Sequence, residues 1–580
     1  MALNLLMSAL AFAGLGASAV CLEKATMLPE GWKMLDDAPD PSTPMRMSVA
    51  LRQPHIHGLS SKILSTSLLG EDDILSLRQP AQGDVDDVMK WLSDNGITTV
   101  RADQDWIHAT ATVGQVDKLL DTKLRRYAFG DGKAILRTTE YNIPEELASA
   151  IDFVHPVANF MTPEHQVSIA PSLPNHRSLN NRQDVACNPI TTPDCINKLY
   201  GINYSTPDGT SPIRFGIVGF LDQWGSYADL RQSFQRSRPE LIKAGYNFSV
   251  ELINGGENKQ DPGRAGTEAD LDLQFGMAVG FPTNVIYYST GGRGKKLDAN
   301  GKPWTGELDD NEPYLDFLQY IAKKPSDELP HVISISYADD ELAVPKPYAI
   351  RVCNEIGMLT ARGVSVLSGS GDGGAKGGRD ATCRSNDGSN KDMTISTFPA
   401  SCPWVTSVGA VNNGEEPPRG AVFSSGGFSS YFPRPGWQKE AVDEYVTVLN
   451  GHLKGYYDPN MRAVPDISVI GTQFQTVVNG RPLLLEGTSA STPVLAAMIA
   501  LINDARVRKG KKVLGWLNDK LYSKEVRSIL QDITKGQSLS CRFSGGRSPG
   551  GWPAAKGYDA ITGLGVPNNF QKFMDVLVDA

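Results

Sequence analysis

The sequence predicts an α/β protein in which a parallel sheet is flanked by helices and preceded by a smaller α+β domain. Short apolar runs alternate with helical stretches after about residue 185, a pattern typical of parallel strands buried on both faces. Before about residue 160, alternating strands and amphipathic helices are mixed instead. A chain of 580 residues is long enough for both units and for a large core.

The chain begins with a short apolar stretch that ends in small residues, with Ala17, Ser18 and Ala19 in an A-x-A pattern. This pattern is typical of a secretory signal peptide, so we expect residues 1–19 to be a signal, cleaved after Ala19, and the protein to be secreted. The alternative is a buried or anchoring N-terminal helix. No later run approaches the roughly 20 apolar residues that span a bilayer, and we expect no membrane partner.

Residues 20–162 are expected to form one α+β domain. Strand patterns occur at 45–53, 106–112 and 125–131, and apolar residues recur at helical spacing at 84–97 and 113–124. Strands and helices in this order indicate a ferredoxin-like arrangement. Residues 163–186 are polar, contain proline and asparagine, and lack an apolar period, which is typical of an exposed linker open to proteolysis.

Residues 187–580 are expected to form the second domain. Its strand candidates are apolar and are separated by helical segments such as 226–237; they lie at 213–220, 284–290, 331–337 and 364–372. Repeated strand and helix indicate a parallel sheet covered on both faces, in which functional groups gather beyond the C-terminal ends of the strands.

The composition argues against several classes of protein. Hydrophobic residues make up 40% and charged residues 21%, which is ordinary for a globular chain. The net charge of −9 argues against a nucleic-acid partner and suits a protein that stays soluble in an acidic medium. The seven cysteines include no C-x-x-C pair, which disfavours zinc and redox motifs. Two sequons, at Asn203 and Asn247, fit a secreted glycoprotein, although such triplets also arise by chance.

The tetrapeptide Gly-Thr-Ser-Ala around Ser489 precedes a helical stretch, and subtilisin-type proteases present their nucleophile in this way. A serine hydroxyl is a poor nucleophile and needs a base. Six of the eight histidines precede residue 185, which leaves His331 and His452 in the second domain. Neither lies in the sequence context of a catalytic histidine, so structural roles are favoured for both. Carboxylates are therefore the remaining candidates for the base.

Glu268 and Asp272 lie four residues apart in the stretch 266–280, which has helical character. Residues at this spacing share a helix face, so the two carboxyls are expected to share a proton and to act in general acid–base catalysis. Asp372 follows a predicted strand at a glycine-rich turn, where a protonated carboxyl could donate a hydrogen bond to an oxyanion. The alternatives are a solvated helix face for the pair and an ordinary turn residue for Asp372.

Together these elements resemble the sedolisin family, the serine-carboxyl peptidases, which have a subtilisin-like fold with Glu and Asp in place of the histidine. The resemblance covers nearly the whole chain after the signal. Residues 40–160 resemble the family's pro-domain, and residues 398–411, 423–438 and 487–523 resemble segments of its catalytic domain. Within the family the chain is most similar to secreted fungal tripeptidyl-peptidases. The resemblance implies a subtilisin-like parallel sheet flanked by helices, preceded by a ferredoxin-like pro-domain.

The resemblance also implies a role for each candidate residue. Ser489 would be the nucleophile, and Glu268 would be the general base and later the acid. Asp272 would orient Glu268 and share its proton, and Asp372 would be the oxyanion-hole acid. A carboxylate with a pKa of about 4 works best as a general base near that pH, so an acid protease is expected.

Two C-terminal segments, residues 530–536 and 556–568, resemble the family's calcium site. The resemblance implies one structural Ca²⁺ per subunit, with water completing an octahedron of oxygen ligands. The implied ligands are the side chains of Asp532 and Asp559 and the backbone carbonyls of Ile533, Ala555 and Gly557. The family often has Gly where this chain has Ala555. The alternative is that both aspartates are ordinary turn residues.

Six of the cysteines follow residue 185 and could form three disulfides. We expect the pairs Cys187–Cys195, Cys353–Cys402 and Cys383–Cys541; the alternative is that some are buried free thiols. The chain also departs from the family at two positions. Ala338 stands where the family usually has Gly, in a segment that runs beside the substrate backbone, and Glu486 replaces a small residue near the nucleophile.

The expected function is that of a secreted acid serine peptidase, made as a self-processing zymogen, that removes tripeptides from the free N-termini of polypeptides. This requires an acid that anchors the α-ammonium group of the substrate; Asp222, Asp339 and Asp340 are candidates, although an ordinary loop carboxylate is favoured for each. The pro-domain is expected to be an intramolecular inhibitor and a folding aid. Cleavage within residues 163–186 is expected to separate it from the catalytic domain. The protein is expected to be a monomer.

Two other functions stay open. One is an acid endopeptidase with an open cleft. The other is an inactive homologue that binds peptides or its own pro-domain, which Ala338 and Glu486 motivate and the intact set of four catalytic candidates opposes. A lipase or esterase is disfavoured, because no G-x-S-x-G surrounds Ser489 and no histidine partner is present.

Overall fold

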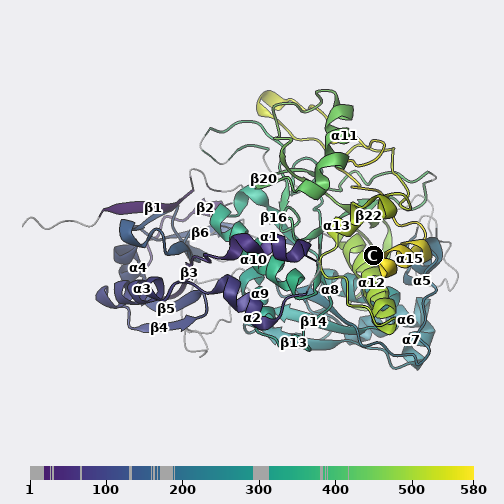
Figure 1. Ribbon diagram of the computed structural model, residues 1–580, viewed down its shortest axis with the longest axis horizontal. Helices are drawn as coiled ribbons and strands as arrows, with labels where there is room; N and C mark the ends of the chain where they lie inside the picture. Colours follow the sequence, from purple (N-terminus) through teal and green to yellow (C-terminus); the bar gives the residue numbers. More distant parts are fainter. Residues whose placement is uncertain are drawn as a thin grey trace, which may run out of the picture.

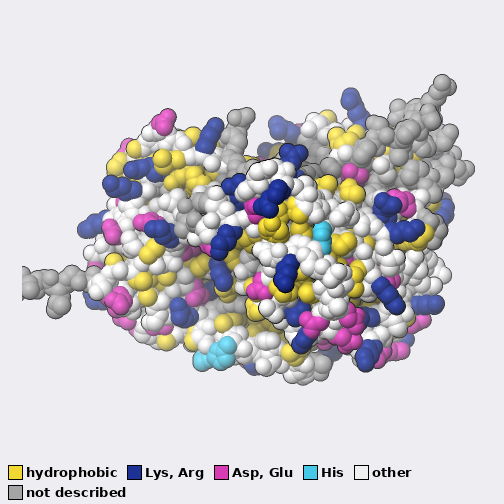
Figure 2. Space-filling model, turned by 90° about the horizontal axis from the view of Figure 1, so that it is seen from above, with side chains coloured by type: hydrophobic (Ala, Val, Ile, Leu, Met, Phe, Trp, Pro, Cys, Tyr) yellow, Lys and Arg dark blue, Asp and Glu magenta, His cyan; other side chains and the backbone are white. Residues whose placement is uncertain are grey.

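The computed structural model describes residues 18–580 except 26–27, 29–31, 66–67, 130–133, 159, 161–163, 166–167, 170–186, 188–189, 292–312, 379–382, 386, 388 and 416. Most of the expected signal peptide therefore lies outside the described residues. In Figure 1 the N-terminal domain lies to the left of a larger domain built on a seven-stranded sheet. Figure 2 shows basic and acidic side chains interspersed among apolar ones on the displayed face. Within the described part, no helix is both long and apolar enough to cross a membrane.

The larger domain is organised around a parallel sheet, as the sequence predicts. Its order is β13-β14-β12-β15-β17-β19-β22, and each neighbouring pair is parallel. The strands are β12 (Arg214–Gly219), β13 (Ser249–Ile253), β14 (Asn284–Thr290), β15 (Val332–Ile335), β17 (Ser365–Gly369), β19 (Thr406–Val411) and β22 (Ile467–Ile470). Helices cover both faces of the sheet, so most side chains on both faces of these strands are buried, and most of them are apolar.

Two pairs of helices cover the sheet. On one face lie α8 (Thr267–Gly280) and α12 (Thr488–Arg508), and on the other α9 (Pro313–Ala322) and α10 (Lys346–Ala361). Strand β14 shows the alternation, because Tyr287 faces the first pair and Tyr288 the second. The surrounding elements are α5 (Pro193–Tyr200), α6 (Tyr227–Ser237), α7 (Pro239–Lys243), α11 (Lys439–Leu449), α13 (Asn518–Leu521), α14 (Lys524–Arg527), α15 (Phe570–Asp579), and the paired strands β20 (Gly427–Pro433) with β21 (Met461–Val464) and β23 (Phe474–Val478) with β24 (Arg481–Glu486).

Small residues let α8 and α12 approach closely. A Cβ atom placed on Gly276 would lie 3.4 Å from Cβ of Pro493, and one on Gly280 would lie 3.4 Å from Cβ of Ala497. Both contacts advance by four residues in the same direction, so the helices run parallel and in register. One turn before these contacts, the same faces carry Asp272 on α8 and Ser489 on α12.

The N-terminal domain has the expected ferredoxin-like order. Its antiparallel sheet runs β4-β5-β3-β9, with α3 (Gln82–Asp94) and α4 (Val113–Leu119) in the crossovers. The strands are β3 (Pro44–Leu51), β4 (Thr99–Asp103), β5 (Trp106–Thr112) and β9 (Ile151–His155).

One strand of this domain differs from the expectation. Residues 125–131 were the expected fourth strand, but β6 (Arg125–Phe129) joins a separate sheet with β2 (Trp32–Met34) and β7 (Ile135–Arg137). Strand β9 takes the fourth place, because its alternating residues Phe153 and Val154 fill the two cores on either side of the sheet.

The two domains meet along α10. Ala50, Trp106 and Phe153 of the N-terminal sheet join the apolar cluster of α9 and α10, and α1 (Leu59–Leu64) and α2 (Glu71–Arg78) pack on the end of α10.

The three expected disulfides, Cys187–Cys195, Cys353–Cys402 and Cys383–Cys541, are all present, and Cys21 is an exposed free thiol.

A buried network of charges crosses this interface. Asp105 of the N-terminal domain is fully buried and pairs with Arg351 of α10 at 2.6 Å and with Arg78 at 3.0 Å. Arg78 also reaches Glu355 of α10 at 3.1 Å. Burial raises the pKa of Glu355, and the charge of Arg78 opposes that rise. Charges buried this deeply must stay paired, so the network commits the two domains to one relative position.

We expect Asp105→Asn in a Ser489→Ala background to lower the free energy of unfolding by about 3 kcal/mol, because two buried guanidinium groups lose a counter-charge. Asp103→Asn is the matched control. Asp103 pairs across the same interface with Lys323, whose side chain is 50% exposed, and this pair is worth less than about 1 kcal/mol. Denaturant unfolding of both variants checks the prediction. An equal loss of unfolding free energy in Asp105→Asn and Asp103→Asn would contradict it.

Candidate active site

Ser489 lies in the first turn of α12 and is fully buried in the intact chain. Its Oγ donates a hydrogen bond to the carbonyl of Ser336 at 3.4 Å. Ser336 connects β15 to the next strand, β16 (Tyr337–Asp340). The serine therefore lies beyond the C-terminal end of a central strand, where parallel sheets gather functional groups.

Glu268 and Asp272 occupy the first turns of α8, and both are almost completely buried. The carboxyl of Asp272 lies next to the carboxyl of Glu268 and the hydroxyl of Ser336. Burial raises the pKa of Asp272 well above its usual range, and these two polar neighbours oppose the rise. The alternative of a solvated helix face is therefore wrong, and the pair can hold a proton where exposed carboxyls have lost theirs.

Gln223, which the sequence did not single out, positions the start of α8. Its Oε1 accepts a hydrogen bond from the backbone N–H of Glu268 at 3.0 Å, and its carbonyl accepts one from the hydroxyl of Tyr287 at 2.6 Å. Glycines make room for both contacts, because a Cβ on Gly266 would lie 2.5 Å from Oε1 of Gln223 and one on Gly219 would lie 2.0 Å from the Tyr287 hydroxyl. No local pattern in the sequence indicated this role, because Gln223 and Glu268 are 45 residues apart.

Asp372 follows β17 and is 2% exposed, so it is not an ordinary surface turn residue. Its Oδ1 accepts two hydrogen bonds from Thr488, from the backbone N–H at 2.8 Å and from the hydroxyl at 3.0 Å. The Thr488 hydroxyl accepts in turn from the N–H of Gly371 at 3.2 Å. Because Oδ1 serves as an acceptor twice, a proton on this carboxyl belongs on Oδ2.

Both histidines of the second domain hold backbone segments. Nδ1 of His331 accepts a hydrogen bond from the N–H of Arg214 at 3.0 Å, and burial lowers the pKa of His331 to about 4. Nε2 of His452 lies 2.8 Å from the carbonyl of Gly551. These contacts agree with the structural roles expected for them.

Parts of the predicted linker pair with strands on either side of Ser489. Strand β10 (Glu164–His165) is antiparallel to β16, with Glu164 opposite Ala338. Strand β11 (Ser168–Ile169) is antiparallel to β24, with Ser168 opposite Glu486. The two departures from the family pattern thus lie where the linker pairs. The polarity of the linker did not indicate these strands, and the rest of residues 163–186 lies outside the described residues.

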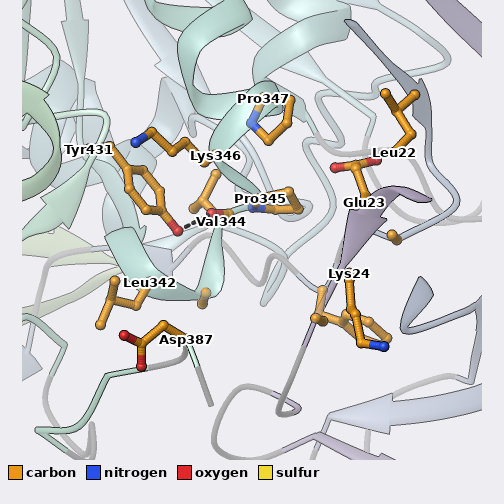
Figure 3. A pocket seen from close by; sticks show the side chains of 14 residues that line it. Leu22, Glu23, Lys24, Leu342, Val344, Pro345, Lys346, Pro347, Asp387 and Tyr431 are labelled. Atoms are coloured by element: carbon orange, nitrogen blue, oxygen red, sulfur yellow. Dashed lines mark hydrogen bonds between the residues drawn. The ribbon is translucent and has the colours of Figure 1, made fainter. Parts of the chain in front are cut away.

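A cavity of about 310 Å³ lies between the domains, beyond the Asp340 end of β16. Figure 3 shows Glu23 and Lys24 of the N-terminal domain facing residues at the start of α10 across it. On the α10 side, the Tyr431 hydroxyl donates to the carbonyl of Val344 at 2.8 Å. A chain that continued along β16 past Asp340 would meet this cavity.

The three candidates for an ammonium anchor differ in their surroundings. Asp222 is exposed, in a loop where it and Leu221 have φ values of 56° and 57°. Asp339 is 9% exposed. Asp340 accepts a hydrogen bond from the N–H of Gly378 at 2.6 Å and so holds the loop that follows Asp372.

The expected calcium ligands lie on two loops, residues 532–533 and 555–559, which a hydrogen bond joins. Oδ2 of Asp532 accepts from the N–H of Gly557 at 3.0 Å, and Oδ2 of Asp559 accepts from the N–H of Ala555 at 3.3 Å. Ile533, the next residue after Asp532, is buried. Two carboxylates and nearby carbonyls form an all-oxygen donor set, which fits Ca²⁺. Among the described residues, no group of three or more His, Cys, Asp and Glu side chains forms a metal cluster, so backbone carbonyls would have to contribute.

Two family models match this chain. One is described as the pro-kumamolisin activation domain and matches residues 30–160, and the other is described as the subtilase family and matches residues 310–533. Among solved structures, Pseudomonas sedolisin complexed with two molecules of pseudo-iodotyrostatin aligns with 67% of this chain and 98% of that chain, with a TM-score of 0.47 and 19% identity.

Curated relatives align along almost the whole length. The chain is 38% identical to tripeptidyl-peptidase sed4 of Aspergillus fumigatus, over 97% of this chain and 98% of that protein. It is 34% identical to the probable tripeptidyl-peptidase SED2 of Arthroderma benhamiae, over 97% of this chain and 96% of that protein. The similarity therefore includes both domains.

Thr488→Val should slow covalent labelling of Ser489 by a fluorophosphonate probe roughly tenfold, because losing the hydroxyl contact to Asp372 costs about 1–1.5 kcal/mol. The backbone N–H of Thr488 still reaches Asp372 in this variant. Thr488→Ser retains the hydroxyl and should label at the original rate. The labelling rates of the three proteins are measured by mass spectrometry at one pH. Equal rates for the Thr488→Val and Thr488→Ser variants would exclude this role of the hydroxyl.

Proposed function

Because the chain belongs to the sedolisin family of serine-carboxyl peptidases, we propose that it is a secreted acid tripeptidyl-peptidase, made as a self-processing zymogen. It is a serine-type peptidase, and the finer proposal is that it releases tripeptides from the free N-termini of polypeptides. The observation that carries the proposal is that Ser489, Glu268 and Asp272 are all buried in the first turns of two helices that pack in parallel register.

In the proposed reaction, Oγ of Ser489 attacks the carbonyl carbon of the scissile peptide bond. Glu268 takes the hydroxyl proton and later delivers it to the leaving amine, while Asp272 shares that proton and orients the Glu268 carboxyl. Asp372, protonated on Oδ2, donates a hydrogen bond to the oxyanion of the tetrahedral intermediate. Tyr287, which is fully buried, stands next to the carboxyl pair and helps to exclude water.

Acid is required at two points of this reaction. The oxyanion donor at Asp372 needs its proton, and the Glu268–Asp272 pair must carry at most one net charge at its buried site. Above the pKa of the pair, two neighbouring carboxylates would face each other in a water-poor environment, which is unfavourable. Activity is therefore expected to fall as the pH rises toward neutrality.

The proposed tripeptide specificity follows from counting along β16. Ser336 contacts the nucleophile, and the pairing of Glu164 with Ala338 gives the register of a bound strand. Three substrate residues would lie opposite positions 336–338, at a rise of roughly 3.4 Å each. The free ammonium group would then lie between Ala338 and Asp339. This register favours Asp339 as the anchor.

The zymogen proposal is supported by the linker strands. β10 and β11 occupy the edges of β16 and β24, which lead to and from the Ser489 region, as a substrate would. We propose that the N-terminal domain, residues 20–162, inhibits the peptidase in this position and that cleavage within residues 163–186 releases residues 187–580. N-terminal sequencing of the secreted protein would locate the cut.

The proposed calcium ion would be held by the side chains of Asp532 and Asp559 and the carbonyls of Ile533, Ala555 and Gly557. Bound Ca²⁺ would supply a structural cross-link between two loops and would take no part in the chemistry. Asn203 and Asn247 are both exposed, which is compatible with the proposed glycosylation.

An acid endopeptidase is a second candidate function. The cavity beyond Asp340 favours it, because removal of the N-terminal domain would open a path for substrate residues that precede a tripeptide. An inactive peptide-binding homologue is disfavoured, since all four catalytic candidates are present in the sequence.

Cleavage of a tripeptide reporter with a free N-terminus should be confined to acid when it is measured from pH 3 to 8. Ser489→Ala should abolish it, and blocking the substrate amine should abolish it as well. Acid activity that survives blocking would establish the endopeptidase instead. Correctly processed protein without activity at any pH would favour the inactive homologue.

Calcium removal should lower the melting temperature of the mature protein, because an ion that binds only the folded state stabilises it by mass action. Melting curves with Ca²⁺ and with a chelator should differ for the parent protein. Asp532→Asn should abolish that difference, whereas Asp575→Asn, which changes an exposed helix residue, should preserve it. A chelator effect that is equal in all three proteins would count against the site.

A further inference from the structure

A second carboxyl pair lies on the helix that carries Glu268 and Asp272. Asp270 on α8 and Asp229 on α6 are both buried, and their carboxyls interact. Ser226 joins the two residues, because its N–H donates to Oδ1 of Asp270 at 2.9 Å and its hydroxyl accepts from the N–H of Asp229 at 3.1 Å. The proposed reaction uses neither residue. Two buried carboxylates in contact repel each other, so this arrangement is stable only while the pair shares a proton.

The backbone contacts indicate which member carries the proton. Both oxygens of Asp229 accept hydrogen bonds from backbone N–H groups, Oδ2 from Asn479 at 2.8 Å and Oδ1 from Gly480 at 2.7 Å. Asp270 accepts through Oδ1 only, from the N–H of Ser226 at 2.9 Å. Oδ2 of Asp270 accepts no hydrogen bond from an N–H or O–H group of the described residues, so it is the atom that suits the shared proton.

Asp229 holds the turn of the hairpin β23–β24. Asn479 and Gly480 form this turn with φ values of 49° and 75°, which is the type I′ geometry. The side chain of Asn479 accepts from the N–H of Ala265, just before α8, at 3.1 Å. The hairpin is thus attached to α8 at its turn, and β24 then leads directly toward Ser489.

A separate contact attaches the middle of the hairpin to the same helix. The side-chain amide of Gln274 on α8 donates to the carbonyl of Val477 at 2.7 Å and accepts from its N–H at 2.9 Å. These amide contacts do not titrate. The carboxyl contact at the turn is therefore the part of the attachment that responds to pH.

We propose that Asp229 and Asp270 are positioning residues that form a proton-sharing clamp, which keeps the hairpin turn and the start of α8 aligned in acid and releases them as the pH rises. The clamp would limit the enzyme to acid through its structure, in addition to the limit that the catalytic carboxyls impose. This inference concerns folding stability and is independent of the proposed substrate.

The electrostatic surroundings agree with this direction. Burial raises the pKa of Asp270 well above its usual range, the Asp229 carboxyl raises it further, and the N–H of Ser226 opposes the rise. The other titratable groups near it are Tyr287 on β14 and, on α8 itself, Glu268 and Asp272. A carboxyl whose pKa is raised by folding contributes stability in acid, and that contribution is lost as the pH rises through the folded-state pKa.

The test compares Asp270→Asn with the parent chain in a Ser489→Ala background, by melting temperature from pH 4 to 7.5. The amide of Asn can donate to Asp229 at every pH and can still accept from Ser226. The variant should therefore lose less stability between pH 4 and 7.5 than the parent, by roughly 3 °C or more. Equal slopes would overturn the proposal.

Asp229→Asn is the contrasting variant, because an amide cannot accept from both backbone N–H groups. It should lower the melting temperature more at pH 4 than at pH 7.5, because at the higher pH the parent has lost the shared proton and is itself destabilised by repulsion. A measurement that needs no change at the clamp is hydrogen exchange of residues 479–480 in the Ser489→Ala chain. Protection should be lost between pH 4 and 7.5 after correction for intrinsic exchange, and unchanged protection would overturn the proposal.

Discussion

The candidate active site depends on one contact, the parallel packing of α8 against α12. Gly276 and Gly280 leave enough room for Pro493 and Ala497 to approach, so the two helices lie close and in register. The proposed acid–base pair and the proposed nucleophile come from separate helices, and neither helix contains the whole site. Because interiors are packed at crystal-like density, a displacement of one helix would be transmitted to its first turn. The carbonyl of Ser336 then joins the start of α12 to the sheet.

Burial is the second constraint, and it accounts for the unusual chemistry. Carboxyl groups lose hydration when they are buried, so they retain protons that exposed acids release. The protein places such groups, Glu268, Asp270 and Asp272 among them, in several buried positions on and around α8. A histidine at the same depth would be pushed toward its neutral form, as His331 illustrates. Acids are therefore the better proton carriers for a dry site that works at low pH.

Much of this arrangement could be predicted from local patterns. The spacing of Glu268 and Asp272 predicted neighbouring carboxyls. The apolar strand before Asp372 predicted that this residue lies beyond the C-terminal end of a strand. Local patterns could not indicate Gln223 or Ser336, whose roles depend on contacts with residues far away in sequence. The same limit explains the fourth strand of the N-terminal domain, because strand patterns do not tell which sheet a strand will join.

The attachment of the linker has a kinetic consequence. While the chain is intact, β10 and β11 are held next to Ser489 at an effective concentration that is commonly in the millimolar range for a short tether. The first cut would therefore be a first-order event, independent of how much protein is present. After the cut, the N-terminal domain competes with substrate only at its bulk concentration. Dilution into a large extracellular volume would then make activation practically irreversible, without any further chemical step.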